Sequence, residues 1–326
     1  MRILFVDRST KLETINDLTT KARGGMVTSL FKVSDYLAWA GHDVTVLSDI
    51  ECDGVTAFGT KWLHEAWGKY DVLVANRGIG DGYPQIDAKA RILWTHDLPH
   101  SGFIPDPQNI RAFDCTVFMS RYAEDIWRTF YRDIGKSVYI PNGVTRQLFK
   151  PGDKDPNLFV FASAPNRGLA KLPFILDCVR ARTSNDVQFH AYSNFAKLHP
   201  GELGEGDDPY DYQPIEDSSV VRKDPLPQRE FAQVLSRASG LLMPSAYPEI
   251  CSNLILQALS AGTPVFTTGR TGSAPEWVRH RKNGMLTEFQ PMDYMVYTVE
   301  MVRNLSEYVL RPRLRRKLQR LSLIHI

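Results

Sequence analysis

Short apolar runs alternate with helix-like segments along most of the chain, and this alternation limits the fold more than any other feature. Six runs in the first half are apolar along most of their length: RILFVD, HDVTVLS, YDVLVAN, ARILWTH, CTVFMS and SVYIPN. Strands that are apolar on both faces are typical of a parallel sheet covered by helices on both sides. The pattern therefore predicts an α/β fold.

The same alternation restarts after the polar, proline-bounded segment PGDKDPN at residues 151–157. A second series of strand candidates follows: NLFVFAS, VQFHAYS, VVRKDPL, GLLMPS, TPVFTT and NGMLTE. Within it, the acidic, Gly- and Pro-rich residues 195–219 predict a long surface loop. A chain of 326 residues also exceeds the usual size of one core. We therefore predict two domains, residues 1–150 and 151–326, whose strands end toward a shared cleft where ligands of such folds bind.

Charge and cysteine content narrow the cellular setting. Lys and Arg number 39 against 37 Asp and Glu, a net charge of +2, so the balance indicates no nucleic-acid partner. The four cysteines lie far apart without a CxxC pair, and the chain begins on a strand-like run without a signal peptide. Both observations predict the reducing cytoplasm. No apolar run approaches the ~18 residues of a membrane span.

The C-terminal segment YVLRPRLRRKLQRL predicts a basic helix with a solvated face. A peripheral contact at the inner membrane face is the other interpretation of this segment. The closing residues, LSLIHI, resemble translated sequencing adaptor. We therefore expect the natural chain to continue further, and the last helix of the second domain to be truncated here.

The stretch YPEICSNLILQALSAGTPVF, residues 247–266, is apolar and yet carries isolated polar residues. It predicts a helix that Ser252 caps and that ends before Gly262. Three polar side chains share one narrow stripe of this helix: Asn253, Gln257 and Ser260. Every other position on it is Leu, Ile or Ala, so the helix is predicted to be buried. The stripe is then a solvent strip, a satisfied core contact or part of a ligand site.

Glu249 favours the ligand site. It lies in the loop just before the helix, where a carboxylate gains from the positive end of the helix dipole. The backbone N–H groups at the start of the helix have no partner within it. An acid beside such donors suits a ligand that is both hydroxylated and anionic.

The longer segment PSAYPEICSNLILQALSAGTPVFTTGRTGSAPEWV resembles the signature of the family-four retaining glycosyltransferases, or glycosyl transferases group 1, of the GT-B fold. That signature has a PS loop ending in an acid, a second acid eight residues on, A-x-G-TPV, and a GG-x-PE-x-V turn. The second acid is Gln257 here, and the glycine pair is Gly272-Ser273.

Four further segments are similar to parts of the same family. ARGGMVTSLFKVSDYLAWAGHDVTVLS resembles its N-terminal glycine loop and helix, and ILWTHDL resembles its histidine strand. IPNGVTRQLFKP is similar to the segment before its linker, and SAPNRGLAKLPFIL to its basic diphosphate-binding turn. The resemblance implies a GT-B fold, with two Rossmann-like domains whose parallel sheets face a central cleft.

The resemblance also implies which residues bind the donor diphosphate. Arg167 and Lys171 follow the strand NLFVFAS one helical turn apart, where both side chains and a helix dipole can address one anion. The family spaces these two residues five apart, whereas here the gap is four. Gly24 and Gly25 open a long helix, where the missing side chains let backbone N–H groups approach phosphate; a plain turn before a helix is the alternative.

For the sugar and ribose, the resemblance implies catalytic roles for Glu249 and His96. His96 ends a buried strand, and a core histidine bonded to backbone is the alternative interpretation. Five residues are expected to bind the donor sugar and ribose: Ile250, Cys251, Ser252, Asn253 and Gln257. An amide at position 257 loses the charge-assisted part of a hydrogen bond, worth roughly 1 kcal/mol.

The implied activity is retaining transfer from a UDP- or GDP-sugar to a hydroxyl of a glycan, lipid-linked or small-molecule acceptor. No metal or cofactor is expected, since the nucleotide sugar is itself a substrate. The DKD segment at 153–155 spells a metal-binding DxD, but no buried strand precedes it. A nucleotide-sugar epimerase or phosphorylase of the same fold, and a non-catalytic sugar-nucleotide-binding protein, are the alternatives.

Overall fold

The computed structural model describes residues 1–77, 86–99, 110–198, 208–269, 272–288 and 294–322, without the side chains of 8–10 and 294–296. The chain folds as two compact units, Met1–Asn142 and Gly143–Ile326. This division falls before the boundary predicted near residue 150, because residues 143–150 belong to the second unit. Phe149 is buried in that core, and its carbonyl accepts a hydrogen bond of 2.9 Å from Ser260 Oγ.

The first unit is built on an eight-stranded sheet in the order β3-β4-β2-β1-β5-β6-β7-β8. Its described strands are β1 (Arg2–Leu12), β2 (Asp43–Ile50), β3 (Gly54–Val55), β4 (Lys61–Leu63), β5 (Tyr70–Asn76), β6 (Ala88–Trp94), β7 (Cys115–Phe118) and β8 (Ser137–Tyr139). Its described helices are α1 (Asp17–Thr20), α2 (Gly25–Trp39) and α4 (Arg121–Phe130). All pairs are parallel except β3 with β4.

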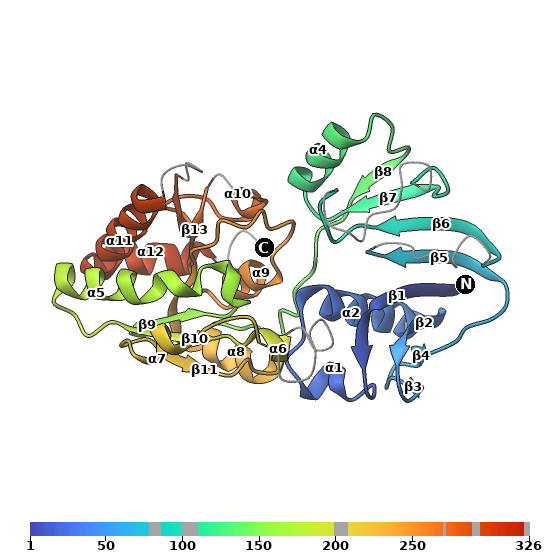
Figure 1. Cartoon of the computed structure of the whole chain (residues 1–326), viewed down its shortest axis with the longest axis horizontal. Coiled ribbons are helices and arrows are strands. Elements are labelled where there is room, and N and C mark those ends of the chain that lie inside the picture. Colours follow the sequence, from blue (N-terminus) through green and yellow to red (C-terminus); the bar gives the residue numbers. More distant parts are fainter. Residues whose placement is uncertain (78–85, 100–109, 199–207, 270–271, 289–293, 323–326) are drawn as a thin grey trace. The chain divides into compact units, whose positions relative to one another are not determined.

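The second unit has a six-stranded parallel sheet in the order β11-β10-β9-β12-β13-β14. Figure 1 labels β9, β10, β11 and β13 of this sheet. Its described strands are β9 (Asp155–Phe161), β10 (Gln188–Tyr192), β11 (Val221–Lys223), β12 (Ala238–Met243), β13 (Val265–Thr268) and β14 (Gly284–Thr287). Its helices are α5 (Leu172–Thr183), α6 (Phe195–Leu198), α7 (Gln213–Glu216), α8 (Gln228–Arg237), α9 (Asn253–Ser260), α10 (Ala274–Trp277), α11 (Tyr294–Leu310) and α12 (Pro312–Ser322). Two 3-10 turns, η2 (Pro165–Arg167) and η3 (Leu169–Lys171), precede α5.

Helices cover both faces of this second sheet, as β9 shows. Phe159 and Phe161 pack in one core cluster with residues of α5 and α11, whereas Val160 between them packs in another with residues of α8 and α9. Alternate side chains of a strand point to opposite faces, so an entirely apolar strand must be covered on both. The twelve predicted strands are all present, and the predicted α/β fold is confirmed.

Two local predictions differ from the structure. The segment 195–219 contains the short helices α6 and α7, because Ile215 is buried in the core and Tyr212 packs against it. Ser252 takes the N-cap position of α9, but its side chain makes no capping hydrogen bond and donates to Met243 Sδ at 4.0 Å instead. The end of α9 is as predicted: Gly262 has φ +67, and Thr263 N donates to the Ala258 carbonyl.

Lys154, in the DKD segment, binds the carbonyl ends of two helices. Its Nζ donates to the Leu235 carbonyl of α8 at 3.0 Å, to the Ala261 carbonyl after α9 at 2.8 Å, and to Thr263 Oγ1 at 2.7 Å. A cation here complements the negative ends of both helix dipoles. Burial lowers the pKa of Lys154 to about 7, and the three acceptors oppose that loss of charge. The lysine therefore ties α8 and α9 to the start of β9.

The basic C-terminal segment forms α12. Leu318 is fully buried and Leu314 packs against the same core, while Arg313 and Arg316 are exposed. One face of α12 thus covers the core of the second unit, and its charges lie on the other. Within the described residues, no helix is both long enough and apolar enough to cross a membrane.

Candidate active site

The strand order of the second unit reverses between β9 and β12, which lie side by side. Connections from these two strands leave in opposite directions, and ligands of doubly wound sheets bind outside the carboxyl ends of the strands at such a point. The turn after β9 carries Arg167 and Lys171, and the loop after β12 carries Glu249. The topology therefore brings three of the predicted site residues to the carboxyl end of the two central strands.

Arg167 and Glu249 form an ion pair beyond the carboxyl ends of β9 and β12. Arg167 Nε lies 3.1 Å from Glu249 Oε1, and both side chains are largely buried, with 19% and 22% of their surface exposed. The Arg167 guanidinium also stacks on the Tyr247 ring, with its central carbon 3.2 Å from the ring centroid. A stacked, ion-paired guanidinium keeps one orientation, and its remaining N–H groups can bind a ligand.

The two charges of this ion pair are largely shielded from solvent. Burial raises the pKa of Glu249 above its usual value, and the Arg167 guanidinium partly offsets the rise. Arg167 Nη1 is buried and has no hydrogen-bond partner among the described residues. A buried donor without a partner costs free energy, so a bound anion at Nη1 would satisfy it.

Two glycines fix the backbone around Glu249. Gly168 has φ +104, and a Cβ on it would lie 2.2 Å from the Pro244 carbonyl oxygen. Gly272 has φ +76, and its Cβ would lie 2.5 Å from both the nitrogen and the oxygen of Glu249. Ser273 N then donates to the Glu249 carbonyl at 2.7 Å. The loop 244–249 is therefore packed between two turns that only glycine allows.

Lys171 and Arg167 contact different groups. The two residues were predicted one helical turn apart at the start of a helix, but they belong to separate 3-10 turns, because Gly168 between them is left-handed. Lys171 is 6% exposed, and its Nζ donates to the Pro244 carbonyl at 3.0 Å and lies 4.5 Å from the centre of the Tyr297 ring. Burial lowers the pKa of this ammonium to about 8. In this structure Lys171 supports the loop from within the unit.

The residues predicted to bind sugar and ribose lie in the same loop and in the first turns of α9. Ile250 and Ser252 are buried, and the others are partly exposed: Cys251, Asn253 and Gln257. The third polar residue of the α9 stripe, Ser260, donates to the Phe149 carbonyl inside the unit. The C-terminal end of the stripe is therefore a satisfied core contact.

His96 lies in the first unit, directly after β6. Its ring packs on Trp94 with centroids 4.6 Å apart, and its Nε2 is buried without a hydrogen-bond partner in the described part of the chain. Burial lowers the pKa of His96 to about 3, and the Arg77 guanidinium adds to the effect. The imidazole is therefore neutral at ordinary pH, and its Nε2 can donate or accept a hydrogen bond with a ligand, according to its tautomer.

The neighbours of His96 are fixed by a further ion pair. Arg77 follows β5 in a left-handed conformation, φ 75, and its side chain binds the Asp97 carboxylate. Trp127 Nε1 donates to the Asp97 carbonyl at 3.0 Å. Asp97 is thus held through its side chain and its backbone, which sets the position of His96 beside it.

The strand order of the first sheet reverses between β1 and β5. Gly24 and Gly25 lie on the β1 side of this point, where they are the N-cap and the first residue of α2. Gly24 has φ −59, which any residue adopts, so the backbone conformation does not require glycine there. Glycine at these two positions adds no side chain beside the N-terminus of α2.

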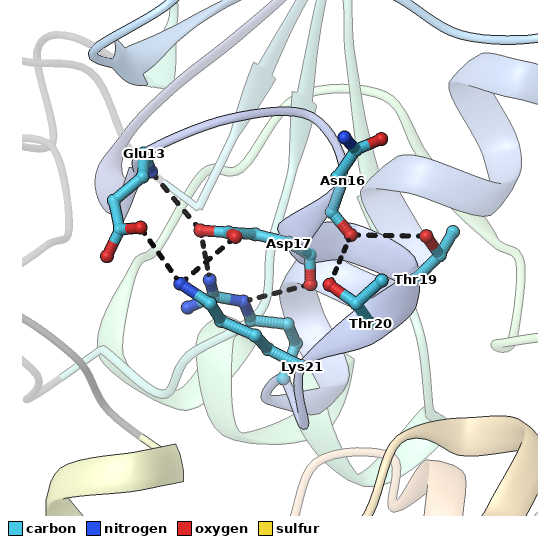
Figure 2. A network of polar contacts seen from close by, with 7 residues as sticks. Glu13, Asn16, Asp17, Thr19, Thr20 and Lys21 are labelled. Carbon is cyan, nitrogen blue, oxygen red and sulfur yellow. Dashed lines mark hydrogen bonds and ion pairs between the residues drawn. The ribbon is translucent and has the colours of Figure 1, made fainter.

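A network of charges holds the segment that leads into Gly24 (Figure 2). Asp17 is 5% exposed and accepts from Glu13 N at 3.2 Å, while Lys21 Nζ lies 3.1 Å from its Oδ1 and 3.1 Å from Glu13 Oε2. Arg23 Nη2 donates to Asp17 Oδ2 at 2.7 Å, and both side chains are 7% exposed. The residue just before the glycines is therefore anchored to α1.

Several of these residues were not found by sequence reasoning. Tyr247 is an aromatic residue two positions before Glu249, and Gly168 directly follows Arg167. Both positions were signals that the sequence analysis missed. The ion pairs Asp17–Arg23 and Arg77–Asp97 join residues six and twenty positions apart that do not share one helix or strand, so no single periodic pattern links them.

Comparison with known proteins gives the class. Residues 177–304 match the model of the family Glycosyl transferases group 1. Sucrose-phosphate synthase from Thermosynechococcus elongatus has a similar structure, with a TM-score of 0.76 at 15% identity over 99% of this chain and 93% of that chain. HepE from Anabaena, solved with UDP-glucose, gives 0.68 at 17% identity over 100% and 95%. WaaG, a glycosyltransferase involved in lipopolysaccharide biosynthesis, gives 0.68 at 12% identity over 99% and 94%. No curated protein matches the chain by sequence.

The two doubly wound units and these neighbours define the GT-B fold, as the resemblance predicted. The family match confirms the resemblance to glycosyl transferases group 1, over a stretch that includes Glu249 and Gln257 and begins after Arg167. The family match over residues 177–304 indicates a glycosyltransferase, and the solved neighbours, all under 25% identical, show the fold.

Proposed function

We propose that the protein is a retaining glycosyltransferase that transfers a hexose from a UDP- or GDP-sugar to a hydroxyl of a glycan, lipid-linked or small-molecule acceptor. The observation that carries this proposal is the ion pair of 3.1 Å between Arg167 and Glu249 at the switch point of the second unit. HepE was solved with UDP-glucose and the glycosyltransferase GtfA with UDP and GlcNAc, which favours UDP as the carrier.

In this proposal the donor diphosphate binds Arg167, whose buried Nη1 has no partner among the described residues. The bond from the anomeric carbon to the phosphate oxygen breaks, and the guanidinium stabilises the charge that develops on the leaving group. The acceptor oxygen bonds to the anomeric carbon on the same face, and its proton passes to the departing phosphate. Glu249 and the loop 250–253 hold the sugar hydroxyls, and Gln257 holds the ribose, so catalysis is positioning plus charge stabilisation.

The first unit contributes His96, Gly24 and Gly25 in this proposal. A neutral imidazole suits a hydrogen bond to a sugar hydroxyl, and the α2 N-terminus suits a phosphate. The cleft that would bring these groups to the donor stays a prediction, as does a diphosphate contact by Lys171. The lysine's bond to the Pro244 carbonyl also lets it act indirectly, through the loop that carries Glu249.

A donor screen tests the proposal. We expect isothermal titration with a panel of UDP- and GDP-sugars to show one preferred donor, and mass spectrometry to show glycosylated product with lipid-linked or oligosaccharide acceptors. The anomeric coupling constant of the product, measured by NMR, should match that of the donor. An inverted product would exclude the retaining mechanism. Tight binding without turnover in every acceptor mixture would identify a non-catalytic binding protein, and a converted donor without an acceptor would identify an epimerase.

Gln257→Glu should tighten donor binding by about fivefold to tenfold, because a carboxylate accepts charge-assisted hydrogen bonds from the ribose hydroxyls, worth roughly 1 kcal/mol more. The dissociation constant from isothermal titration measures this. The matched control is Gln233→Glu, the same substitution at an exposed position of α8, which should leave the dissociation constant unchanged. Weaker binding by Gln257→Glu would mean that the amide has its own adapted partner.

A further inference from the structure

A second polar pocket lies in the second unit, away from the switch point. Its volume is about 440 Å³, and seven residues line it: Arg182, Arg281, Arg303, Ser306, Glu307, Leu310 and Arg311. Five of them, from 303 to 311, recur at the spacing of one helix face along α11 and just past its end. Arg182 is at the C-terminal end of α5, whereas Lys171 precedes the first residue of that helix. The 12 residues of α5 therefore separate this pocket from the Arg167 turn by about 18 Å.

The pocket is strongly basic, and its one acid organises two of its four arginines. Glu307 accepts from Arg281 Nη1 and Nη2, each at 2.7 Å, and lies 3.0 Å from Arg311 Nη1. The Arg281 hydrogen bonds are the largest cause of a lowered pKa of Glu307, so this carboxylate is ionised at ordinary pH. One glutamate cannot neutralise four guanidinium groups, so positive charge remains in the pocket.

Two arginines and one hydroxyl of the pocket have no hydrogen-bond partner in the described part of the molecule. Arg182 and Arg303 are exposed and form no hydrogen bond there, although the charge of Arg303 contributes to the lowered pKa of Glu307. Ser306 is 4% exposed, and its Oγ is buried without a hydrogen-bond partner. A buried hydroxyl without a partner is rare in folded proteins and needs an explanation. A ligand oxygen in the pocket would provide the missing bond.

We propose that this pocket binds a phosphate-bearing anion. Guanidinium groups bind phosphate oxygens through paired N–H donors, and Arg182 and Arg303 are available for such bonds. Ser306 Oγ adds a neutral donor, while Glu307 keeps Arg281 and Arg311 in place. A volume of about 440 Å³ accommodates a small phosphorylated metabolite or the headgroup of an anionic lipid.

Titration with inorganic pyrophosphate tests the proposal. It is carried out with the full chain carrying Arg167→Ala, so that binding at the proposed donor site does not contribute. We expect saturable binding that weakens at least tenfold when Arg182→Ala and Arg303→Ala are added. Ser306→Ala alone should weaken binding about threefold to tenfold. The matched control is Arg313→Ala with Arg316→Ala, which removes the same charge from exposed positions of α12 outside the pocket and should change the dissociation constant less than twofold.

Sedimentation with vesicles distinguishes the two sources of phosphate. Vesicles of phosphatidylcholine alone are compared with vesicles that also contain phosphatidylglycerol. Co-sedimentation with the anionic vesicles only, lost in the Arg182→Ala/Arg303→Ala variant and competed by pyrophosphate, assigns a lipid headgroup. Pyrophosphate binding without co-sedimentation assigns a soluble phosphate ester.

The proposal is overturned if the Arg182/Arg303 variant binds pyrophosphate as tightly as the α12 control, or if the Arg167→Ala chain binds none. Both substituted arginines are exposed and form no hydrogen bond with the described residues, so the fold should persist. Equal unfolding temperatures of the two double variants verify that. Because Arg167 is absent throughout, the result is independent of whether the proposed transferase activity is correct.

Discussion

Arg167→Ala should lower kcat/KM for sugar transfer by about 10²–10³-fold while the protein stays folded. A preorganised donor aimed at charge that develops in the transition state contributes about 2.7–4 kcal/mol. Arg167 is held for that purpose by Glu249 on one side and the Tyr247 ring on the other. Its removal also leaves Glu249 buried without a countercharge, which should raise the pKa of that carboxyl further. Initial rates with the preferred donor measure the loss.

Arg222 provides the matched control, because it has the same kind of surroundings elsewhere in the unit. It lies in β11 at the sheet edge, pairs with Glu216 through Nε at 3.0 Å, and has its guanidinium 4.4 Å from the centre of the Tyr212 ring. Arg222→Ala should leave kcat/KM within twofold of wild type, while both variants keep similar unfolding temperatures. If Arg167→Ala keeps a third or more of the activity, the assignment of Arg167 to the diphosphate is wrong.

The strands were predictable because each strand of a parallel sheet that is covered on both faces is a continuous apolar run in the sequence. Phe159, Val160 and Phe161 face alternate cores, and all three are buried. The short strands β3 and β4 were missed, because two- and three-residue edge strands carry no periodic signal. Residues 195–219 looked like an uninterrupted loop, since the local composition does not reveal that Ile215 reaches the core.

For the site, the sequence predicted candidate residues but not which groups their side chains contact. Arg167 and Lys171 are four apart, which on a regular helix would place them on one face. The left-handed Gly168 separates them, so that one pairs with Glu249 and the other with the Pro244 carbonyl. Contacts of this kind depend on where a distant loop passes, and no local pattern records that. The basic pocket on α11 was missed for the same reason, since Arg182 and Arg281 are distant from it in sequence.

His96 joins the proposed chemistry to the stability of the first unit. A neutral, buried imidazole whose Nε2 has no hydrogen-bond partner among the described residues is suited to a hydrogen bond with a ligand, but the same burial penalises its protonated form. The pKa of His96 is lowered from 6.5 to about 3 in the folded protein. Between these two values the unfolded chain binds a proton that the folded chain does not. The free energy of unfolding therefore falls as the pH falls through this window.

The contribution of His96 to the free energy of unfolding should therefore drop by about 2 kcal/mol from pH 7 to pH 5, at about 1.4 kcal/mol per pH unit below the unfolded pKa. Urea unfolding followed by tryptophan fluorescence measures this in the full chain, because five of the six tryptophans lie in the first unit. His96→Asn should lose this part of the pH dependence, whereas His64→Asn, at an exposed position of the same unit, should retain it. An equal loss of stability between pH 7 and pH 5 in wild type and His96→Asn would show that the imidazole is solvated, and its role as a neutral partner of the donor sugar would lose its physical basis.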